Sequence, residues 1–267
     1  MRLQTVPSIR RYVADVRRSR MTLYYLCVRE FRVRYRYTHL GWLWAVIQPL
    51  AMMAALTAVF TIFTPVKTDE PYPVFSLLNL SVWTFFAASL SGSSQSLLSN
   101  GPLLKKVYFP RCIVPAAAVF GSAVDFGAML LSVAAIFAVF RIHLHWTALL
   151  LVVAVVWEAL FCLAMAVAVS MLTVFFRDLR HLIAVALQVW LFASPVLYPV
   201  TAVPERFRHA YMLNPMAGIL SFYHDILLRG RIDRPRELAI SAAVTVVLLA
   251  CSAAYFMRRD KNCVDLL

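Results

Sequence analysis

Long stretches without a charged side chain constrain the fold of this chain more than any other feature. Residues 41–64, 71–104 and 238–257 contain no Asp, Glu, Lys or Arg. A helix needs roughly 20 consecutive, mostly apolar residues to cross a bilayer. The composition agrees, because 62% of the residues are hydrophobic and only 15% are charged, whereas soluble domains are about half apolar and about a quarter charged. The sequence therefore predicts an integral membrane protein built from helices.

The positions of the charged residues divide the chain into six expected spans. They cover about 41–64, 74–99, 112–140, 146–176, 181–200 and 238–257. Between the last two, apolar segments too short to span are broken by Asn214-Pro215 and Gly218, and such segments suit re-entrant or interfacial helices. We therefore expect an all-α fold with one transmembrane domain, 41–267, and with short re-entrant or interfacial helices between the fifth and sixth spans.

The first 40 residues differ from the rest because they are basic. Residues 1–20 form a polar arm, and 21–38 interleave arginine with aromatic and apolar residues. An amphipathic interface helix of this composition lies in the headgroup zone, with its guanidinium groups toward lipid phosphates. A solvated basic linker is the alternative. The candidates for lipid-phosphate contact at this gateway are Arg29, Arg32, Arg34 and Arg36.

The distribution of basic residues predicts the orientation in the membrane. Six spans place both termini on one side, and that side carries 18 of the 26 Lys and Arg residues. Cytoplasmic loops of membrane proteins are enriched in Lys and Arg, so we expect both termini in the cytosol. Six of the eight basic residues on the other side fall within 206–236, which fits a structured external segment. These clusters account for the net charge of +13, and no nucleic-acid partner is expected.

Motifs for nucleotide binding and hydrolysis are missing from the sequence. It contains no GxxxxGK[ST] phosphate-binding loop, no HExxH and no GxSxG, so we expect no ATP site and no catalytic residue of these classes. The five cysteines form no CxxC pair. His143 and His145 are better explained as interfacial anchors than as metal ligands. We therefore expect neither a metal nor a cofactor in this chain.

Two carboxylates inside expected spans are unusual. Asp125 lies in the third span and Glu158 in the fourth. An ionisable group within the bilayer is costly and is often functional. Hydrogen bonding to neighbouring helices is the simpler explanation, and substrate or proton handling is the alternative.

Small and aromatic residues suggest a path for a ligand. The second span ends in SGSSQSLLSNG (91–101), whose small residues allow either close helix packing or a polar pore lining. Aromatic faces can bind sugar rings through contacts that tolerate sliding, although membrane belts and packing explain many of the rings. The candidates for a glycan path are Trp42, Trp83, Phe85, Phe86, Trp190 and Tyr198.

Five stretches occur in an order that is typical of one family. They are REFRVRYRYTHLGWLWAVIQPL (29–50), SNGPLLKKVYFPR (99–111), FFRDLRHL (175–182), LFASPVLYP (191–199) and LNP (213–215). Over about 20–257 the chain resembles the permease subunit of ABC-2-type polysaccharide exporters. These proteins move lipid-linked O-antigen, capsular polysaccharide or teichoic acid across the bacterial cytoplasmic membrane.

The resemblance implies partners and contact sites. Two permease copies pair with two copies of a cytosolic ATPase that binds ATP and Mg²⁺, so this chain itself is not expected to be an enzyme. Its other partners would be the lipid-linked glycan and the membrane lipids. The family's short external helices between the fifth and sixth spans match about 202–230. Its coupling region matches 102–111, and the cytosolic turn after the fourth span is a second contact. The candidates for ATPase contact are Lys105, Lys106, Val107, Tyr108, Arg177, Asp178 and Arg180.

Two other functions are compatible with parts of the sequence. An integral membrane enzyme of glycan or lipid metabolism would use Asp125 or Glu158 and would need a larger catalytic segment. An ion-coupled secondary transporter would show inverted repeats and helices interrupted at the midplane, and no such repeat is visible in the sequence.

Overall fold

The computed structural model describes residues 9–63, 70–107 and 109–263, and every regular element in these ranges is helical. The all-α prediction is therefore confirmed for the described residues. Five helical segments are long and apolar enough to cross a membrane. They are Gly41–Ile62, Tyr72–Ser99, Ile113–Val139, Trp146–Phe175 and Pro235–Asp260. These segments correspond to five of the six expected spans.

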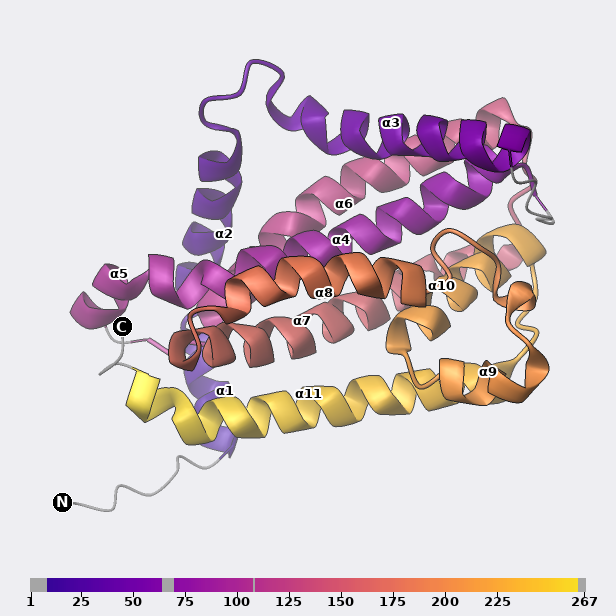
Figure 1. Cartoon of the computed structure of the whole chain (residues 1–267). Helices are drawn as coiled ribbons and strands as arrows, with labels where there is room; N and C mark the ends of the chain where they lie inside the picture. The colour runs from indigo at the N-terminus through magenta and orange to yellow at the C-terminus, as the bar shows by residue number, and fades with distance from the viewer. Residues whose placement is uncertain (1–8, 64–69, 108, 264–267) are drawn as a thin grey trace.

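The long helices run side by side, and the two ends of the bundle differ (Figure 1). The long elements are α3 (Trp44–Ala58) with its flanking turns η1 (Gly41–Leu43) and η2 (Val59–Phe63), α4 (Tyr72–Ser99), α6 (Ile113–Val139), α7 (Leu151–Phe175) with η3 (Trp146–Leu150), and α11 (Pro235–Cys263). The shorter ones are α5 (Gly101–Lys106), α8 (Leu179–Ala193), α9 (Glu205–Tyr211) and α10 (Pro215–His224). We call the end with α5, the α7–α8 turn and the end of α11 the proximal end. The end with α9 and α10 is the distal end.

α4 forms the centre of the bundle. It contacts α3, α6, α7 and α8, and most of its side chains are buried. Phe85 stacks on Phe126 of α6 at a ring-centroid distance of 4.8 Å. Phe86 stacks on Phe161 of α7 at 5.0 Å. Each such pair contributes about 0.5–1.5 kcal/mol beyond the burial of its area, so these rings hold α4 between α6 and α7.

The small residues at the end of α4 serve packing on one face and are exposed on the other. Ser93 is buried and donates from Oγ to the carbonyl oxygen of Pro115 at 3.3 Å. A Cβ on Gly92 would lie 3.8 Å from that of Ala118 in α6, so the two helices approach closely. Ser91 and Gln95 are exposed. Close packing therefore explains the buried face, and the other face lies open.

α8 is shorter than the expected fifth span. Its 15 residues rise by about 22 Å at 1.5 Å per residue, whereas the hydrocarbon core of a bilayer is about 30 Å thick. The helix ends because Ser194 precedes Pro195, and a proline disfavours helical geometry at the residue before it. Asn79 of α4 then donates from Nδ2 to the carbonyl oxygens of Pro195 and Val196 at 3.2 and 3.0 Å. The expected end of this span, Val200, was therefore placed too far along the chain.

The expected short helices before the last span are present at the distal end. They are η4 (Val200–Ala202), α9, α10 and η5 (Asp225–Arg229). α10 is buried at most of its positions and packs against α7 and α11, so it re-enters the bundle. Asn214 caps its start, because its Oδ1 atom accepts a hydrogen bond from the N–H of Met216 at 3.1 Å. Pro215 suits the first helical position. The prediction of re-entrant helices is confirmed.

α1 (Ile9–Arg18) and α2 (Arg20–Tyr35) form the described part of the N-terminal arm. α2 runs across the axis of the bundle (Figure 1) and packs against α6. Its exposed positions mix Tyr24 and Tyr25 with Arg29, so apolar and basic side chains are not separated onto two faces. α2 therefore crosses the bundle as expected of an interface helix, but it is not strictly amphipathic. Packing on α6 decides which of its residues are buried.

Candidate functional site

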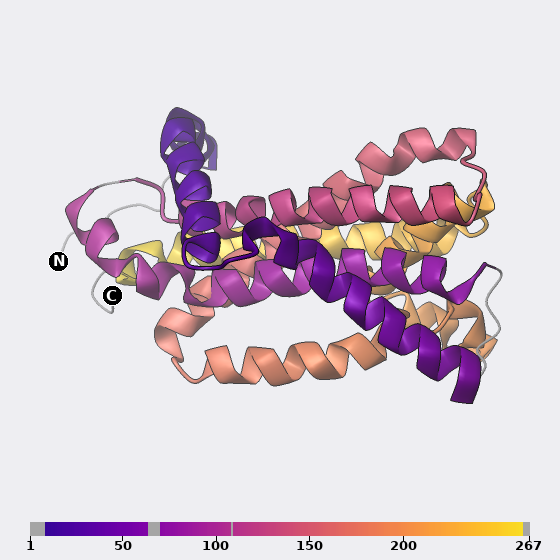
Figure 2. The same ribbon diagram turned by 90° about the horizontal axis from the view of Figure 1, so that it is seen from above.

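A wide groove lies beside α3 and α4. Seen from above, α3 crosses over α4 while α8 runs along one side of the bundle (Figure 2). A cavity of about 840 Å³ lies between α3 and α4 and reaches Leu191 of α8. A second cavity of about 410 Å³ continues it toward α2 and α6. The two cavities share the lining residues Trp44, Gln48, Pro49, Thr84 and Ala88. We call the combined space the α3–α4 groove.

Small side chains leave this groove open, and aromatic rings line it. Ala51 and Ala55 contribute from α3, and Ala87 contributes from α4. Trp83 and Phe85, two of the six aromatic candidates, line the larger and the smaller cavity respectively. Trp44, which was not among those candidates, lines both. Of these three rings Trp44 is the exposed one, whereas Trp83 and Phe85 are buried. A ligand in the groove would therefore meet the indole of Trp44 on a mostly apolar wall.

The other four aromatic candidates lie elsewhere. Phe86 and Trp190 pack in the core with ring centroids 5.1 Å apart. Tyr198 is at the distal end, where its hydroxyl oxygen lies 3.0 Å from that of Tyr211. Trp42 is exposed in η1, before α3. Their predicted contact with a glycan finds no support in the lining of the groove.

Asp125 closes the end of the groove nearest α2. Arg34 forms an ion pair with its Oδ2 atom, and the hydroxyl of Tyr35 donates to its Oδ1 atom at 2.8 Å. Arg34 also donates from Nη2 to the Oγ atom of Ser122 at 3.2 Å. Burial, together with the hydrogen bond to Asp125, raises the pKa of Tyr35 to about 12, so this tyrosine keeps its proton at neutral pH. Pairing with a neighbouring helix, the simpler of the two explanations, therefore describes Asp125 in the structure.

The four gateway arginines do not form one cluster. Arg29 donates to the Oδ1 atom of Asn100 at the junction of α4 and α5. Arg32 and Arg36 are exposed. Of the four, Arg34 is the one that lines the groove. A common phosphate site for all four is therefore not formed, and contact of each with lipid phosphate stays a prediction.

The residues expected to contact an ATPase lie at the proximal end (Figure 1). The exposed ones are Lys105, Lys106 and Val107 at α5 and Arg177, Asp178 and Arg180 at the α7–α8 turn. Tyr108 lies outside the described residues. Arg111 pairs with Asp260 of α11 at 2.9 Å, which ties the connection between α5 and α6 to the last helix. This end of the bundle therefore offers two exposed segments to a partner.

Glu158 lies in the protein interior, away from the groove. It is fully buried in α7 and accepts a hydrogen bond from the hydroxyl of Tyr223 in α10 at 2.7 Å. It therefore joins α7 to the re-entrant helix, whereas Asp125 binds α2. The two intramembrane carboxylates thus have separate partners and do not make a common site.

Sequence reasoning missed a polar network at the distal end. Because Nδ2 of Asn79 donates to two carbonyl groups, its Oδ1 atom is the acceptor for Nε2 of His224 at 2.7 Å. Asn214 accepts from the indole N–H of Trp190 at 3.1 Å and donates to Oγ of Ser194 at 2.9 Å. The two asparagines thereby fix the end of α8 to α4 and α10. The sequence feature that could have revealed this network is the LNP stretch (213–215), which contains Asn214.

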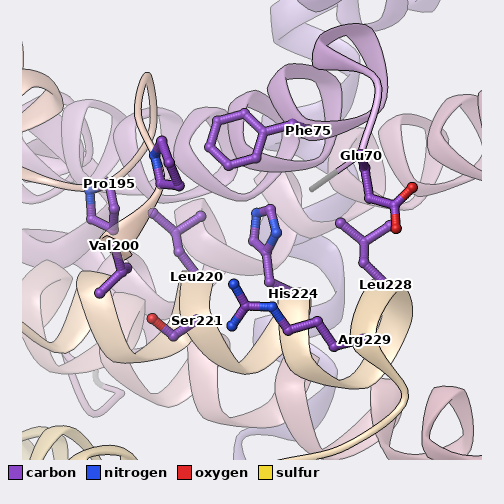
Figure 3. A pocket seen from close by; sticks show the side chains of 10 residues that line it. Glu70, Phe75, Pro195, Val200, Leu220, Ser221, His224, Leu228 and Arg229 are labelled. Carbon is purple, nitrogen blue, oxygen red and sulfur yellow. The ribbon is translucent and has the colours of Figure 1, made fainter. Parts of the chain in front are cut away.

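A small cavity of about 60 Å³ opens beside that network (Figure 3). Phe75 and Leu220 form apolar walls, and Glu70, His224 and Arg229 supply polar groups. A cavity of this size holds a few water molecules and is too small for a sugar ring. The α3–α4 groove is therefore the better candidate for a ligand site.

Comparison with known proteins identifies the family. The sequence profile of the ABC-2 type transporter family matches residues 21–228, from α2 to η5. The chain belongs to the ABC-2 type transporter family. An O-antigen export system permease protein, RfbA, of Myxococcus xanthus is 31% identical over 94% of this chain and 97% of that protein. An RfbA permease of Klebsiella pneumoniae is 26% identical over 77% and 79%. The polysialic acid transport protein KpsM of Escherichia coli is 22% identical over 91% and 95%.

Membership of the ABC-2 family agrees with the fold. The chain is a multi-pass membrane protein, and its named relatives are transport proteins rather than enzymes. The five stretches that resemble the family all lie inside the matched region. The groove of this ABC-2 permease also lies within it, because its lining residues run from Arg34 to Met129 and Leu191.

Proposed function

We propose that this ABC-2 permease exports a lipid-linked cell-surface polysaccharide across the cytoplasmic membrane of a bacterium. The relatives named for O-antigen export and polysialic acid transport support this class of substrate. The structural observation that carries the proposal is the α3–α4 groove. Its larger cavity of about 840 Å³ lies in the range of about 300–1,000 Å³ that is usual for ligand sites.

The walls of the groove suit a polymer that must slide. Trp44 is 48% exposed and presents an aromatic face to the groove, while the buried rings of Trp83 and Phe85 form part of the wall behind it. Such a face contacts sugar rings without fixing one orientation. Apolar contacts are non-directional, so successive sugar units meet the same surface. A site built from many directed hydrogen bonds would hold each unit instead of passing it on.

A second copy of the chain would complete the groove. α3 and α8 flank it and are loosely packed, because α3 buries Pro49 and α8 buries Ile183 and Leu187 among their described residues. One face of α8 carries an exposed apolar stripe of Leu182, Val185, Val189 and Phe192. Two such faces related by a twofold axis, the commonest symmetry of oligomers, would enclose a pore between the copies.

A separate cytosolic ATPase would supply the energy. The sequence has no phosphate-binding loop of its own, so ATP and Mg²⁺ would bind to that partner. We assign the proximal end and both termini to the cytosol, following the excess of basic residues on that side. α5 follows α4 directly through Asn100, so a force on Lys105 and Lys106 would reach the helix that lines the groove.

The phosphate of the lipid carrier would enter near α2. Arg29, Arg32 and Arg36 would attract it to this end of the protein, since basic residues near a membrane surface attract anionic headgroups. Arg34 is the one with access to the groove. A guanidinium forms strong, charge-assisted hydrogen bonds with phosphate oxygens.

Deletion of the gene tests the proposed function. We expect lipid-linked glycan to accumulate on the cytosolic face of the membrane and to decrease in the periplasm, with recovery when the wild-type chain is supplied. Normal amounts of glycan in the periplasm of the deletion strain would rule out the exporter. A neighbouring gene that encodes an ATPase with a phosphate-binding loop would support the proposed ATPase partner.

The alternative functions receive less support. A membrane enzyme would need its carboxylates at one reactive site, but Asp125 pairs with Arg34 and Glu158 accepts from Tyr223. An ion-coupled transporter would have helices interrupted at the midplane, whereas the break after α8 adjoins the distal segment. The exporter therefore accounts for more of the described structure.

A further inference from the structure

The Arg34–Asp125 pair stands at an opening rather than in a packed core. The side chain of Asp125 is 8% exposed, and that of Arg34 is 31% exposed. Both line the cavity of about 410 Å³ that continues into the α3–α4 groove. A guanidinium that borders such a cavity has room to exchange one anionic partner for another.

The donors around Asp125 suit a phosphate group as well as a carboxylate. Arg34 directs one N–H group at Asp125 and another at Ser122, and the hydroxyl of Tyr35 adds a third donor. Arginine recognises carboxylates and phosphates through the same planar fork of N–H groups. A phosphate group has more charge at neutral pH and more acceptor oxygens than one carboxylate, so it can compete for these donors.

We propose that Asp125 is a tethered competitor for the phosphate of the lipid carrier. Its carboxylate holds Arg34 and Tyr35 until a phosphate-bearing lipid enters the groove. The phosphate oxygens then take both donors, and Asp125 is released. The inference rests on the proposed function, because it takes a lipid-linked phosphate as the ligand. To the proposed function it adds Asp125 as the residue that sets the affinity for phosphate. It also adds the contact of Asp125 with Arg34 and Tyr35 as the one that phosphate binding breaks.

Loss of the contact between Arg34 and Asp125 would also affect the proximal end, because α2 has a second anchor there. Arg29, on the same helix as Arg34, donates to the Oδ1 atom of Asn100. Asn100 also donates from Nδ2 to the carbonyl oxygen of Ser96 at 2.7 Å and lies between α4 and α5. α2 therefore links the groove to the junction that carries Lys105. Entry of the phosphate would thereby loosen α2 next to the coupling helix.

A purely structural ion pair predicts the opposite effect on binding. If the pair only fastens α2 to α6, neutralising Asp125 leaves Arg34 badly placed and weakens phosphate binding. If Asp125 competes with phosphate, the same change releases Arg34 and strengthens binding. The sign of the change in affinity therefore separates the two explanations.

The test compares Asp125→Asn with the wild type for binding of farnesyl pyrophosphate by the full-length chain in phosphatidylcholine nanodiscs. We expect a Kd about tenfold lower for Asp125→Asn, because the binding-competent state is no longer masked by an internal anion. Arg34→Gln should lose most of the binding. Asp15→Asn is the matched control, since it removes the same charge from the exposed surface of α1, outside the lining of the cavity. Its Kd should stay within about twofold of the wild type, because water and salt screen an exposed charge.

One further ligand, inorganic pyrophosphate, identifies the source of the affinity. A lower Kd of Asp125→Asn for farnesyl pyrophosphate but not for inorganic pyrophosphate supports a lipid headgroup as the ligand. An equally large decrease in the Kd for inorganic pyrophosphate supports the same competition, but with a free phosphate group rather than a lipid headgroup as the ligand. An unchanged or higher Kd for farnesyl pyrophosphate overturns the proposal. If neither protein binds the probe while gene deletion still blocks export, the competition is wrong and the proposed function stands.

A measurement on the wild type covers the case in which Asp125→Asn fails to fold. Farnesyl pyrophosphate should speed hydrogen exchange at the amides of residues 30–35 relative to farnesol, because α2 loses an anchor on α6 and opens more readily. Unchanged or slower exchange there would mean that the phosphate does not break the pair, and the proposal would be wrong.

Discussion

One hydroxyl group joins the re-entrant helix to the bundle. Tyr223 of α10 is fully buried and donates to Oε2 of Glu158, while Oε1 of that carboxyl group has no hydrogen-bond partner in the described part of the chain. Tyr223→Phe leaves both oxygens without a donor. We expect it to lower the free energy of unfolding by about 1–3 kcal/mol, the usual penalty for an unsatisfied buried polar group. Thermal unfolding of the purified chain in detergent measures this change.

The background that isolates this effect is Glu158→Leu. It removes the buried carboxyl group, so Tyr223→Phe added to it should cost much less stability than in the wild type. An equal cost in both backgrounds would assign the effect to the packing of the phenol ring, and the hydrogen bond would then contribute little.

At the scale of single residues, the sequence identified unusual side chains but not their partners. Asp125 and Glu158 were recognisable because charged residues are rare within spans. Their partners, Arg34 and Tyr223, lie 91 and 65 positions away, and no local pattern encodes contacts over such separations. Asn79 gave no signal, although it fixes the end of α8, because one amide in an apolar helix has no distinct period.

At the scale of helices, α10 and α11 approach as closely as their backbones allow. A Cβ on Gly218 would lie 2.3 Å from both Cβ and Oγ of Ser241. The hydroxyl of Ser241 already donates to the carbonyl oxygen of Met212 at 2.6 Å, so it has little freedom to move. Gly218→Ala should therefore push α10 away from α11 and lower stability by about 1–3 kcal/mol, as overpacking usually does. A lower Tm would report the loss.

Gly127 of α6 provides the matched control for this prediction. Apart from its chain neighbours and its own helix backbone, no heavy atom of the described residues lies within 4 Å of a Cβ built there, and the residue is in a helix interior. Gly127→Ala should therefore leave the stability unchanged or raise it by up to about 1 kcal/mol, the difference in helix propensity. If both substitutions lower the Tm equally, the close contact at Gly218 is not the cause.

The long helices could be predicted because their signal is local. The run of apolar residues and the thickness of a bilayer together define α4, α6, α7 and α11, whose bounds match the expected spans closely except at the ends of α11. α8 was predicted too long, because LFASPVLYP (191–199) is as apolar as a span. Its actual end depends on Pro195 and on Asn79 of another helix. The mixed surface of α2 likewise reflects packing on α6, which hydropathy does not report.

At the scale of the whole molecule, the exposed lysines of α5 should transmit force without supporting the fold. Lys105→Glu with Lys106→Glu reverses both charges at the proximal end. We expect export and polysaccharide-stimulated ATP hydrolysis by the complex to fall by at least about tenfold, since reversing a rim charge creates like-charge repulsion with a partner, and about 1.4 kcal/mol is enough for a tenfold change. The Tm should not change, because both side chains are exposed.

Arg206→Glu with Arg236→Glu is the control for this charge reversal. Both arginines are exposed and lie in the distal segment and at the start of α11, so the net charge changes equally at the opposite end. Stimulated ATP hydrolysis should stay near the wild-type rate. A loss as large as that of the lysine variant would show a general effect of charge, and α5 would then have no special role in coupling.

The groove itself predicts which surface two copies share. If a second copy closes the α3–α4 groove, the apolar stripe of α8 faces its counterpart, and Val189 lies near the twofold axis. In a background without the five native cysteines, Val189→Cys should give a dimer with a short bis-maleimide cross-linker in native membranes. Val247→Cys should not, because α11 lies at the side of the bundle away from α3 (Figure 1), although Val247 and Val189 are similarly exposed, at 59% and 64%. Exposure to lipid is thus matched, and only the position in the assembly differs. The reverse result would put α11 at the interface and leave the groove open to lipid, so a pore between the two grooves could not form.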